Sequence, residues 1–366
     1  MKERGRGATT GCGDGARRDE APAAMCTVRS PPATESLEEW GTPATMRERF
    51  QILSLDGGGI RGIFSAALLA AIEEDLGTRV ADHFDLIAGT STGGIIAVAL
   101  GLGMSPKEIV DFYIRFGPRV FRNPFGVRSL QHWIFRKYSS GSFQKALQET
   151  FGERLFGEST KRLVIPSFNL GEDDVYVFRT PHSNKLRRDY KVPAWKVALA
   201  TAAAPTYFPV CRAVDRLRLL DGGVWANNPA MVALVEAFGT LGVSLERTWL
   251  LSIGTYDAVA GRPSYLDEGG RIVWAFNAHK VILRAGSIGV DNQARFLLGG
   301  ERLLRIDPKV PDSDVVLDDA SRAEHLITRA RHHSRAFMPE IAAKFGQHNA
   351  GSYSPVYPRE KGPPHD

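Results

Sequence analysis

The sequence predicts an α/β protein with a central, mostly parallel β-sheet that is flanked by helices. From residue 50 onward, short apolar runs rich in strand-forming residues alternate with segments of helical character. The first two of these runs each lead through a glycine-rich turn directly into a helix. Because parallel strands must be joined by a crossover, usually a helix, this alternation favours a parallel sheet covered on both faces.

The first strand is the run FQILSLD (50–56), and the apolar helix after it (61–77) ends at Gly77. The second strand, FDLIAGT (84–90), passes into a helix rich in small and apolar residues (91–103). Four later runs have the same strand character and lie at residues 162–170, 174–180, 217–223 and 248–254. Later helices are predicted at residues 194–203, 228–241 and across much of 320–345. The sequence has no internal repeat.

Three parts are predicted along the 366-residue chain. Residues 1–46 are rich in Gly, Ala, Pro, Thr and charged residues and have no periodic apolar pattern. They also lack the apolar stretch of a secretory signal, so we expect a disordered N-terminal tail. Residues 47–350 are predicted to form one folded domain, and residues 351–366 a flexible C-terminal tail.

The composition, 43% hydrophobic and 24% charged residues, is typical of a globular protein in water. No run approaches the ~18 uncharged apolar residues that a membrane-spanning helix needs. The net charge of +5 falls on the body, because the N-terminal tail is about neutral. It suits anionic membrane surfaces or nucleotide ligands, and the alternative is a solvated basic face, which most proteins with this balance have. Cys12, Cys26 and Cys211 have no metal-ligand spacing. We therefore expect a reducing, cytoplasmic setting.

The second glycine turn, Gly89-Thr90-Ser91-Thr92-Gly93, has the Gly-x-Ser-x-Gly pattern of a nucleophile elbow. Its glycines let the backbone turn sharply between a buried strand and a helix, which exposes the serine hydroxyl above the sheet. The N-terminus of the helix points at the same place, and its partial positive charge favours an alkoxide or a tetrahedral oxyanion. The pattern predicts a nucleophile at Ser91. The alternative is a turn of small residues that lets the helix pack closely on the sheet.

The first glycine turn, DGGGIRG, allows two interpretations. Gly57, Gly59 and Gly62 have the G-x-G-x-x-G spacing of a loop that binds a dinucleotide. The three successive glycines Gly57, Gly58 and Gly59, followed by Arg61, also fit a loop whose amides hold an oxyanion that develops during a reaction.

The second strand decides between these interpretations. A dinucleotide fold requires an acidic residue at the far end of that strand, ~20 residues past the loop, to bind the ribose hydroxyls. Asp82 and Asp85 fall at the beginning of the strand, and its far end is Gly89-Thr90-Ser91. Neither turn ends in Gly-Lys-Ser/Thr, which excludes a P-loop. The first turn is therefore predicted to be the oxyanion hole of an acyl-transfer site.

The stretch LRLLDGGVWANNPA places Asp221 at a strand end, followed by Gly222 and Gly223. A carboxylate there, beside the serine of another strand, can accept the serine proton and orient the hydroxyl. One alternative is an Asp-Gly turn in which Asp221 only caps a backbone amide. Another is a conventional triad in the order Ser, Asp, His, because four histidines follow Asp221: His279, His325, His332 and His333.

Taken in order, the segments DGGGIRG (56–62), GTSTGG (89–94) and DGG (221–223) resemble the patatin-like phospholipase family. The segment ATAAAPTYFPV (200–210) resembles the alanine-rich helix and Pro-Tyr-Phe-Pro exit of that family, and the resemblance covers roughly residues 50–253. It implies a three-layer patatin-like fold and a dyad of Ser91 and Asp221 without histidine. It also implies oxyanion amides from Gly57, Gly58 and Gly59 with Arg61 close by, and no metal or cofactor.

The resemblance implies a lipid acyl hydrolase of the phospholipase A type, which cleaves fatty-acyl esters of membrane phospholipids through an acyl-enzyme. The glycine loop, the FDLIAGTSTGG turn and the helix in residues 103–121 most resemble bacterial effectors of antiphage (CBASS) signalling, in which a cyclic oligonucleotide activates the enzyme. The messenger pocket is expected outside the three catalytic turns or at the subunit interface of a homo-oligomer. The alternatives are a constitutive lipid esterase and a non-catalytic protein that binds lipids or nucleotides.

Residues 105–140 combine basic and aromatic side chains, which suits peripheral docking on the inner membrane. The alternative is a small aromatic core under a lid with solvated cations. A single-stranded nucleic acid could use the same residue types. That reading leaves Ser91 and the glycine turns without a role, so no nucleic-acid polymer is expected as a partner.

Overall fold

The computed structural model describes residues 49–120, 140–256, 258–259, 264–311, 320–351 and 353–357. The predicted disordered tail (1–46) and residues 121–139 of the basic, aromatic segment lie outside the described residues. Of the predicted C-terminal tail, residues 352 and 358–366 also lie outside them. The chain continues past residue 350 with hydrogen bonds to the body, because the Val356 amide donates to the Pro181 carbonyl oxygen at 2.8 Å.

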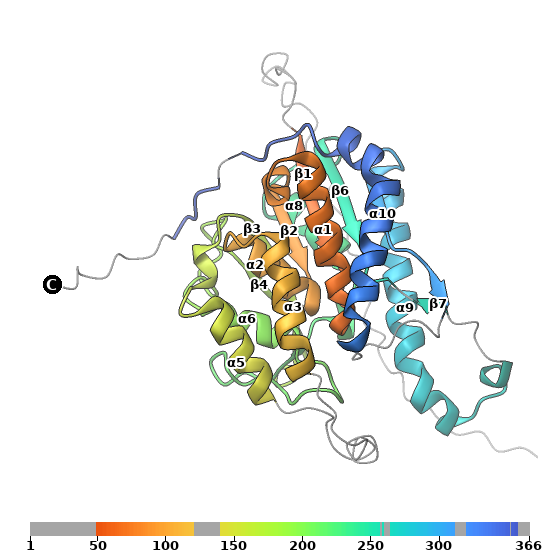
Figure 1. Cartoon of the computed structure of the whole chain (residues 1–366). Helices are drawn as coiled ribbons and strands as arrows, with labels where there is room; N and C mark the ends of the chain where they lie inside the picture. Colours follow the sequence, from red (N-terminus) through yellow and green to blue (C-terminus); the bar gives the residue numbers. More distant parts are fainter. Residues whose placement is uncertain are drawn as a thin grey trace, which may run out of the picture. The chain divides into compact units, whose positions relative to one another are not determined.

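In the described part of the chain, seven strands form one sheet in the order β4-β3-β2-β1-β6-β8, with β5 also paired to β3 (Figure 1). The strands are β1 (Phe50–Leu55), β2 (Leu86–Gly89), β3 (Arg162–Asn169), β4 (Asp174–Arg179), β5 (Leu219–Asp221), β6 (Thr248–Ile253) and β8 (Leu303–Ile306). Strands β3, β2, β1, β6 and β8 are parallel, whereas β4 and β5 run antiparallel to β3. The mostly parallel sheet predicted from the sequence is confirmed. A separate two-stranded pair joins β7 (Ala258–Val259) and β9 (Val310–Pro311).

The helices are α1 (Gly62–Leu76), α2 (Thr92–Gly101), α3 (Pro106–Val120), α5 (Ser140–Phe151), α6 (Ala194–Thr201), α7 (Gly223–Ala226), α8 (Ala230–Gly239), α9 (Arg271–Leu298) and α10 (Ala323–Lys344). In Figure 1, α1, α3 and α10 lie in front of the sheet and α8 lies behind it. The three-layer α/β fold is thus confirmed.

The alternation of side chains along each strand builds a core on both faces of the sheet. Leu53 and Ile87 belong to the core shared with α1, α2, α6 and α10. Their chain neighbours Ile52 and Leu86 belong to the opposite core, which contains residues of α8 and α9. Because every strand residue of β1 and β2 is buried, these strands appear in the sequence as continuous apolar runs.

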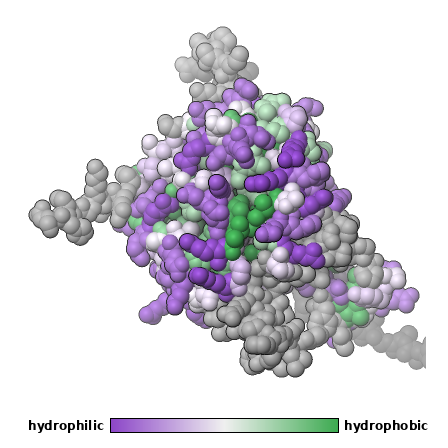
Figure 2. Space-filling view, in the orientation of Figure 1, coloured by the Kyte–Doolittle hydropathy of each residue, from purple (hydrophilic) through white to green (hydrophobic). Residues whose placement is uncertain are grey.

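The surface seen in Figure 2 is mostly hydrophilic, with a small hydrophobic patch near its centre, where α1 lies between α3 and α10. Helix α9 also carries large apolar residues that are exposed, among them Ile282 and Phe296. Within the described ranges, no helix is both long enough and apolar enough to cross a membrane.

The segments that follow β2 and β5 are far apart in the sequence but meet because both strands pair with β3. Both pair with the same strand: Ala88 of β2 lies opposite Val164, and Asp221 of β5 lies opposite Ser167. Because β2 runs parallel to β3 and β5 runs antiparallel to it, their carboxyl ends point toward each other across the short stretch of β3 between these partners. The residues that follow the two strand ends are therefore brought together.

Candidate active site

Ser91 lies in the turn between β2 and α2 with φ 55° and ψ −122°, a conformation that is unfavourable for a residue with a Cβ. The neighbouring glycines are required by close approach: a Cβ on Gly89 would overlap the carbonyl group of Gly93, and one on Gly93 would overlap the carbonyl oxygen of Leu55. The Gly-x-Ser-x-Gly pattern thus forms a strained turn from strand to helix, which presents a partly exposed serine at the carboxyl edge of the sheet.

The structure brings Ser91 and Asp221 together. The Ser91 hydroxyl donates a hydrogen bond of 2.6 Å to Asp221 Oδ2. The other carboxylate oxygen, Oδ1, accepts a 2.7 Å hydrogen bond from the Gly223 amide. Asp221 is buried, and this burial raises the pKa of its carboxyl to about 6, although the two hydrogen bonds act in the opposite direction. A carboxylate with such a pKa is ionised at neutral pH and is basic enough to take the serine proton.

Thr201, the last residue of α6, binds the amide of Ser91 and the amide of the residue after Asp221, a role that sequence analysis missed. Its hydroxyl accepts a 3.0 Å hydrogen bond from the Ser91 amide and donates one of 2.6 Å to the Pro166 carbonyl oxygen. The Thr201 carbonyl oxygen accepts the Gly222 amide at 3.1 Å. The sequence predicts a helix over residues 194–203, and the segment 200–210 resembles the corresponding segment of the family. Nothing in a Thr-Ala-Ala-Ala run indicates that its hydroxyl faces a distant serine.

Thr90 and Thr92 anchor the turn on either side of Ser91. The Thr90 hydroxyl donates to the carbonyl oxygen of Ala226 in α7 at 2.6 Å. The Thr92 hydroxyl forms a short hydrogen bond with the hydroxyl of Tyr113 in α3. Both threonines are buried, so these contacts join the turn to α7 and α3 and restrict its movement.

The first glycine turn lies beside Ser91, as a Cβ on Gly57 would be 3.2 Å from Ser91 Cβ. The Gly57 amide, however, donates to the Asn227 carbonyl oxygen at 3.0 Å. Within the described residues the amides of Gly58 and Gly59 have no hydrogen-bond acceptor, so two of the three amides assigned from the sequence are available to an oxyanion. The Arg61 side chain donates through Nε to the Gly58 carbonyl oxygen at 3.2 Å, which places it on the loop itself.

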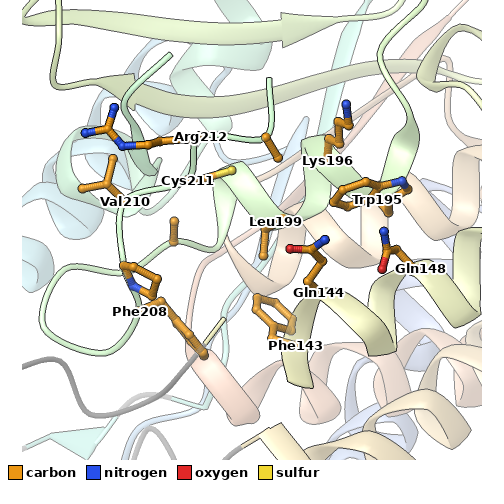
Figure 3. Close-up of a pocket in the computed structure, with 13 residues that line it drawn as sticks. Phe143, Gln144, Gln148, Trp195, Lys196, Leu199, Phe208, Val210, Cys211 and Arg212 are labelled. Atoms are coloured by element: carbon orange, nitrogen blue, oxygen red, sulfur yellow. The ribbon is translucent and has the colours of Figure 1, made fainter. Parts of the chain in front are cut away.

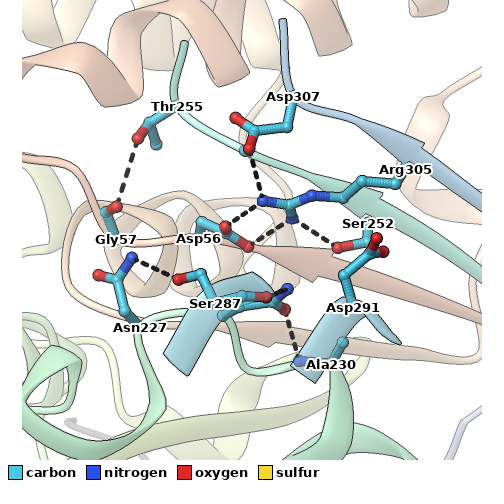
Figure 4. A network of polar contacts seen from close by, with 12 residues as sticks. Asp56, Gly57, Asn227, Ala230, Ser252, Thr255, Ser287, Asp291, Arg305 and Asp307 are labelled. Carbon is cyan, nitrogen blue, oxygen red and sulfur yellow. Dashed lines mark hydrogen bonds and ion pairs between the residues drawn. The ribbon is translucent and has the colours of Figure 1, made fainter. Parts of the chain in front are cut away.

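An ion pair fixes the start of this glycine loop (Figure 4). Both carboxylate oxygens of Asp56 accept hydrogen bonds from Arg305 of β8, at 2.9 and 2.6 Å. Arg305 also donates to Ser252 Oγ at 2.8 Å and lies 3.2 Å from Asp307 Oδ2. Since Asp56 is buried, the loop that carries Gly58 is held by a paired charge at its first residue. No short pattern in the sequence links position 305 to the loop.

Helix α9 contacts the site through the turn that follows Asp221. The Ser287 hydroxyl accepts a hydrogen bond from Asn227 Nδ2 at 3.3 Å, and the Ser287 carbonyl oxygen accepts one from Asn228 Nδ2 at 3.4 Å (Figure 4). Because the Asn227 carbonyl oxygen holds the Gly57 amide, α9 is connected to the glycine loop through the turn that follows Asp221.

No histidine contributes to the hydrogen bonds that Ser91 and Asp221 form within the described part of the chain. The ring of His333 instead packs beside those of Phe64 and Tyr256, at centroid distances of 6.1 and 6.0 Å. The arrangement seen here therefore lacks the conventional triad. The residues that the structure describes also contain no group of three His, Cys, Asp or Glu side chains that could hold a metal ion.

Comparison with known proteins shows which family this chain is similar to. Residues 53–234 match the family described as patatin-like phospholipase, and this range includes both Ser91 and Asp221. Three bacterial relatives are named cGAMP-activated phospholipase. The relative from Pseudomonas aeruginosa is 33% identical over 272 residues, which are 72% of this chain and 80% of the relative.

The relative from Vibrio cholerae is 31% identical over 78% of this chain and 90% of its own length. The relative from Escherichia coli is 35% identical over 76% of this chain and 86% of its own length. These relatives confirm the resemblance to the bacterial branch of cyclic-nucleotide-activated enzymes. Each of these relatives is at least 31% identical to this chain, and the aligned region covers at least 80% of the relative's length. The chain therefore belongs to the patatin-like phospholipase family and is an acyl-ester hydrolase.

Proposed function

We propose that this hydrolase cleaves fatty-acyl esters of membrane phospholipids, with Ser91 as the nucleophile and Asp221 as the general base. Asp221 Oδ2 takes the proton of the Ser91 hydroxyl while Oγ attacks the ester carbonyl carbon. The amides of Gly58 and Gly59 and the N-terminus of α2 stabilise the resulting oxyanion. Collapse of the tetrahedral intermediate expels the lysophospholipid alkoxide, which takes the proton from Asp221, and leaves the acyl group on Ser91.

Asp221 then acts a second time. It removes a proton from a water molecule, which attacks the acyl-enzyme and releases the fatty acid, and the proton returns to Ser91 Oγ. The single observation that carries this mechanism is the 2.6 Å hydrogen bond from the strained Ser91 to the buried Asp221. A carboxylate can serve as the base here because burial has already raised its pKa to about 6.

The names of the three bacterial relatives support a cyclic nucleotide as the activator of this chain as well. In this proposal the enzyme is a gated antiphage effector that degrades the inner membrane from its cytoplasmic side. Docking uses the exposed basic residues of α3, Arg115 and Arg119, near the exposed apolar side chain of Ile114. Lys107 of α3 is a further exposed cation of the predicted docking segment, and the remaining cations of that segment lie in residues 121–139, outside the described part of the chain.

The proposed function is tested by fatty-acid release from vesicles of phosphatidylethanolamine and phosphatidylglycerol, using wild type and Ser91→Ala with and without a panel of cyclic oligonucleotides. Release that requires both Ser91 and one nucleotide is the expected result. Release that requires Ser91 alone would identify a constitutive lipid esterase and overturn the proposed regulation. Equal release by Ser91→Ala would overturn the mechanism.

A further inference from the structure

A cavity of about 720 Å³ lies between α5, α6 and the segment that leads into β5 (Figure 3). Helix α5 contributes Phe143, and α6 contributes Trp195 and Leu199. The loop that borders the cavity carries Phe208 and Cys211. Its size falls in the range of sites for small-molecule ligands and cofactors. Ser91 and Asp221 are not among the residues that line it.

The chemistry of the lining favours an anion that has heterocyclic groups. Two cations, Lys196 and Arg212, line the cavity, and none of its lining residues, all within the described ranges, is acidic. Neither cation forms an ion pair with another described residue. The amides of Gln144 and Gln148 add donors and acceptors that suit the polar edges of nucleobases, and Figure 3 shows Gln144 near Phe143 and Gln148 near Trp195. A fatty acid, by contrast, has only one polar end to place.

The walls of this cavity are connected to both catalytic residues. Helix α6 ends at Thr201, whose hydroxyl holds the Ser91 amide. Two residues later, the Ala203 carbonyl oxygen accepts the Asp221 amide at 3.0 Å, and Ala203 itself lines the cavity. A second connection runs through Cys211, which exchanges two backbone hydrogen bonds with Leu219 at the start of β5. A ligand that restrains α6 and the loop would therefore restrain the position of Asp221 relative to Ser91.

We infer that this cavity is the site of the activating cyclic dinucleotide, with Lys196 and Arg212 binding its phosphodiester groups. This inference rests on the proposed regulation and adds the place where the activator binds. Occupancy fixes α6, and through Thr201 and Ala203 it sets the 2.6 Å contact of the dyad. Charge-assisted contacts to phosphate are strong enough for two such cations to dominate affinity.

The test measures binding of cGAMP by isothermal titration calorimetry to the full chain in a Ser91→Ala background, which excludes turnover. Removal of both cations by Lys196→Ala and Arg212→Ala is expected to raise Kd by roughly 100-fold, because each charge-assisted contact contributes about a factor of ten. The matched control removes two exposed cations that do not line the cavity, by Lys145→Ala and Arg218→Ala. The control should bind like the parent protein.

Each outcome separates this inference from the function on which it rests. Equal Kd values for the cavity variant and its control, with nucleotide-dependent lipid hydrolysis intact in the wild type, would overturn the site and leave the regulation standing. An absence of cGAMP binding to the wild type would overturn both the site and the regulation by this nucleotide. The proposed hydrolysis is tested independently, by Ser91-dependent release of fatty acid from vesicles. Displacement of cGAMP by oleate would assign the cavity to a fatty-acid product and overturn the inference.

A second variant keeps the test valid if the double variant does not fold. Arg212 is exposed, so Arg212→Glu is expected to preserve the fold while it places a negative charge beside the phosphates. It should weaken cGAMP binding by at least ~10-fold. In the parent protein, cGAMP should also slow hydrogen exchange of the Asp221 and Gly222 amides, since their acceptors belong to the α6 end. Unchanged exchange at these amides in the saturated protein would contradict the connection to the dyad.

Discussion

The hydroxyl of Thr201 lies 3.0 Å from the Ser91 amide nitrogen and 2.6 Å from the Pro166 carbonyl oxygen, and it bonds to both. One buried side chain thus joins the nucleophile turn to β3, the strand from which β5 positions Asp221. The contact fixes the strained backbone of Ser91 from outside the turn itself. This relationship leads directly to a test of whether the turn must be held in place for catalysis.

We expect Thr201→Val to lower kcat while KM changes little, because Thr201 positions the serine and does not contact substrate. The Ser91 amide and the Pro166 carbonyl would both lose a buried partner, so the free energy of unfolding should fall by about 1–3 kcal/mol. Thr201→Ser, which keeps the hydroxyl, should recover most of kcat. Steady-state kinetics on a soluble ester checks this, and a loss of kcat in Thr201→Ser with kcat retained in Thr201→Val would show that the methyl group, rather than the hydroxyl, matters.

The pH dependence of activity should report Asp221. Burial raises its pKa to about 6, and only the ionised carboxylate can accept the serine proton. We therefore expect kcat/KM for a soluble monomeric ester to fall about tenfold per pH unit below about pH 6 and to be constant above it. A profile that is flat between pH 5 and pH 8 would show that the group that accepts the proton is not this carboxylate.

The same pKa predicts how Asp221 affects stability. Its pKa is raised from 3.8 to about 6, so the folded protein binds more protons than the unfolded chain between these two values. The free energy of unfolding contributed by this group is therefore highest below about pH 4, falls as pH rises through about 6 and stays low above it. We expect Asp221→Asn to be inactive yet more stable than wild type by about 1–3 kcal/mol at pH 8.

Denaturant unfolding at two pH values measures this difference. At pH 8 the Asp221→Asn variant should have the higher midpoint, whereas near pH 3.5 the two proteins should unfold at similar denaturant concentrations. A variant that is less stable than wild type at pH 8 would mean that the hydrogen bonds from Ser91 and Gly223 outweigh the cost of burying the charge.

The backbone of Ser91 offers a test of strain. At φ 55° a residue with a Cβ is strained and a glycine is not. Both Ser91→Ala and Ser91→Gly should abolish hydrolysis, and Ser91→Gly should be the more stable of the two by about 1 kcal/mol after its larger loss of entropy on folding is included. Thermal unfolding of the two variants compares them directly. Greater stability of the alanine variant would argue against strain at this turn.

The ion pair between Asp56 and Arg305 should contribute to stability as one coupled unit. Arg305→Met leaves Asp56 buried without its main partner and should cost about 3–5 kcal/mol. Replacing both, by Asp56→Leu with Arg305→Met, should cost less than the sum of the single changes, because no buried charge is left unpaired. Urea unfolding of the four proteins forms the double-mutant cycle. Strictly additive losses would exclude an energetic link between the two residues.

Much of this site could be predicted because it consists of local patterns. The turn around Ser91 requires glycine at positions 89 and 93, where neighbouring backbone leaves no room for a Cβ. A short run of consecutive residues therefore identifies the turn. The same holds for the glycine loop and for Asp221 at a strand end. Alternating strands and helices indicated a mostly parallel sheet, which the structure confirms.

The remaining features depend on contacts between distant residues. Thr201 and Arg305 act on residues more than 100 positions away, so no local pattern reveals them. Helix α9, 28 residues long, was not predicted, and its exposed Ile282 and Phe296 disturb the pattern of a one-sided apolar helix. The Gly57 amide was assigned to an oxyanion from its place in a glycine run. Its acceptor, the Asn227 carbonyl oxygen, comes from a turn 170 residues later.

The most direct test of the dyad is covalent labelling of the protein with a fluorophosphonate, followed by mass spectrometry of the digested protein. The reagent reacts with an activated serine, so the wild type should carry one adduct on the peptide that contains Ser91. Asp221→Asn should label at least ~100-fold more slowly, since general-base catalysis contributes typically 10²–10⁴-fold, and Ser91→Ala should not be labelled there. Labelling of a different residue, or an equal rate in Asp221→Asn, would contradict the assignment of Ser91 as nucleophile and Asp221 as its base.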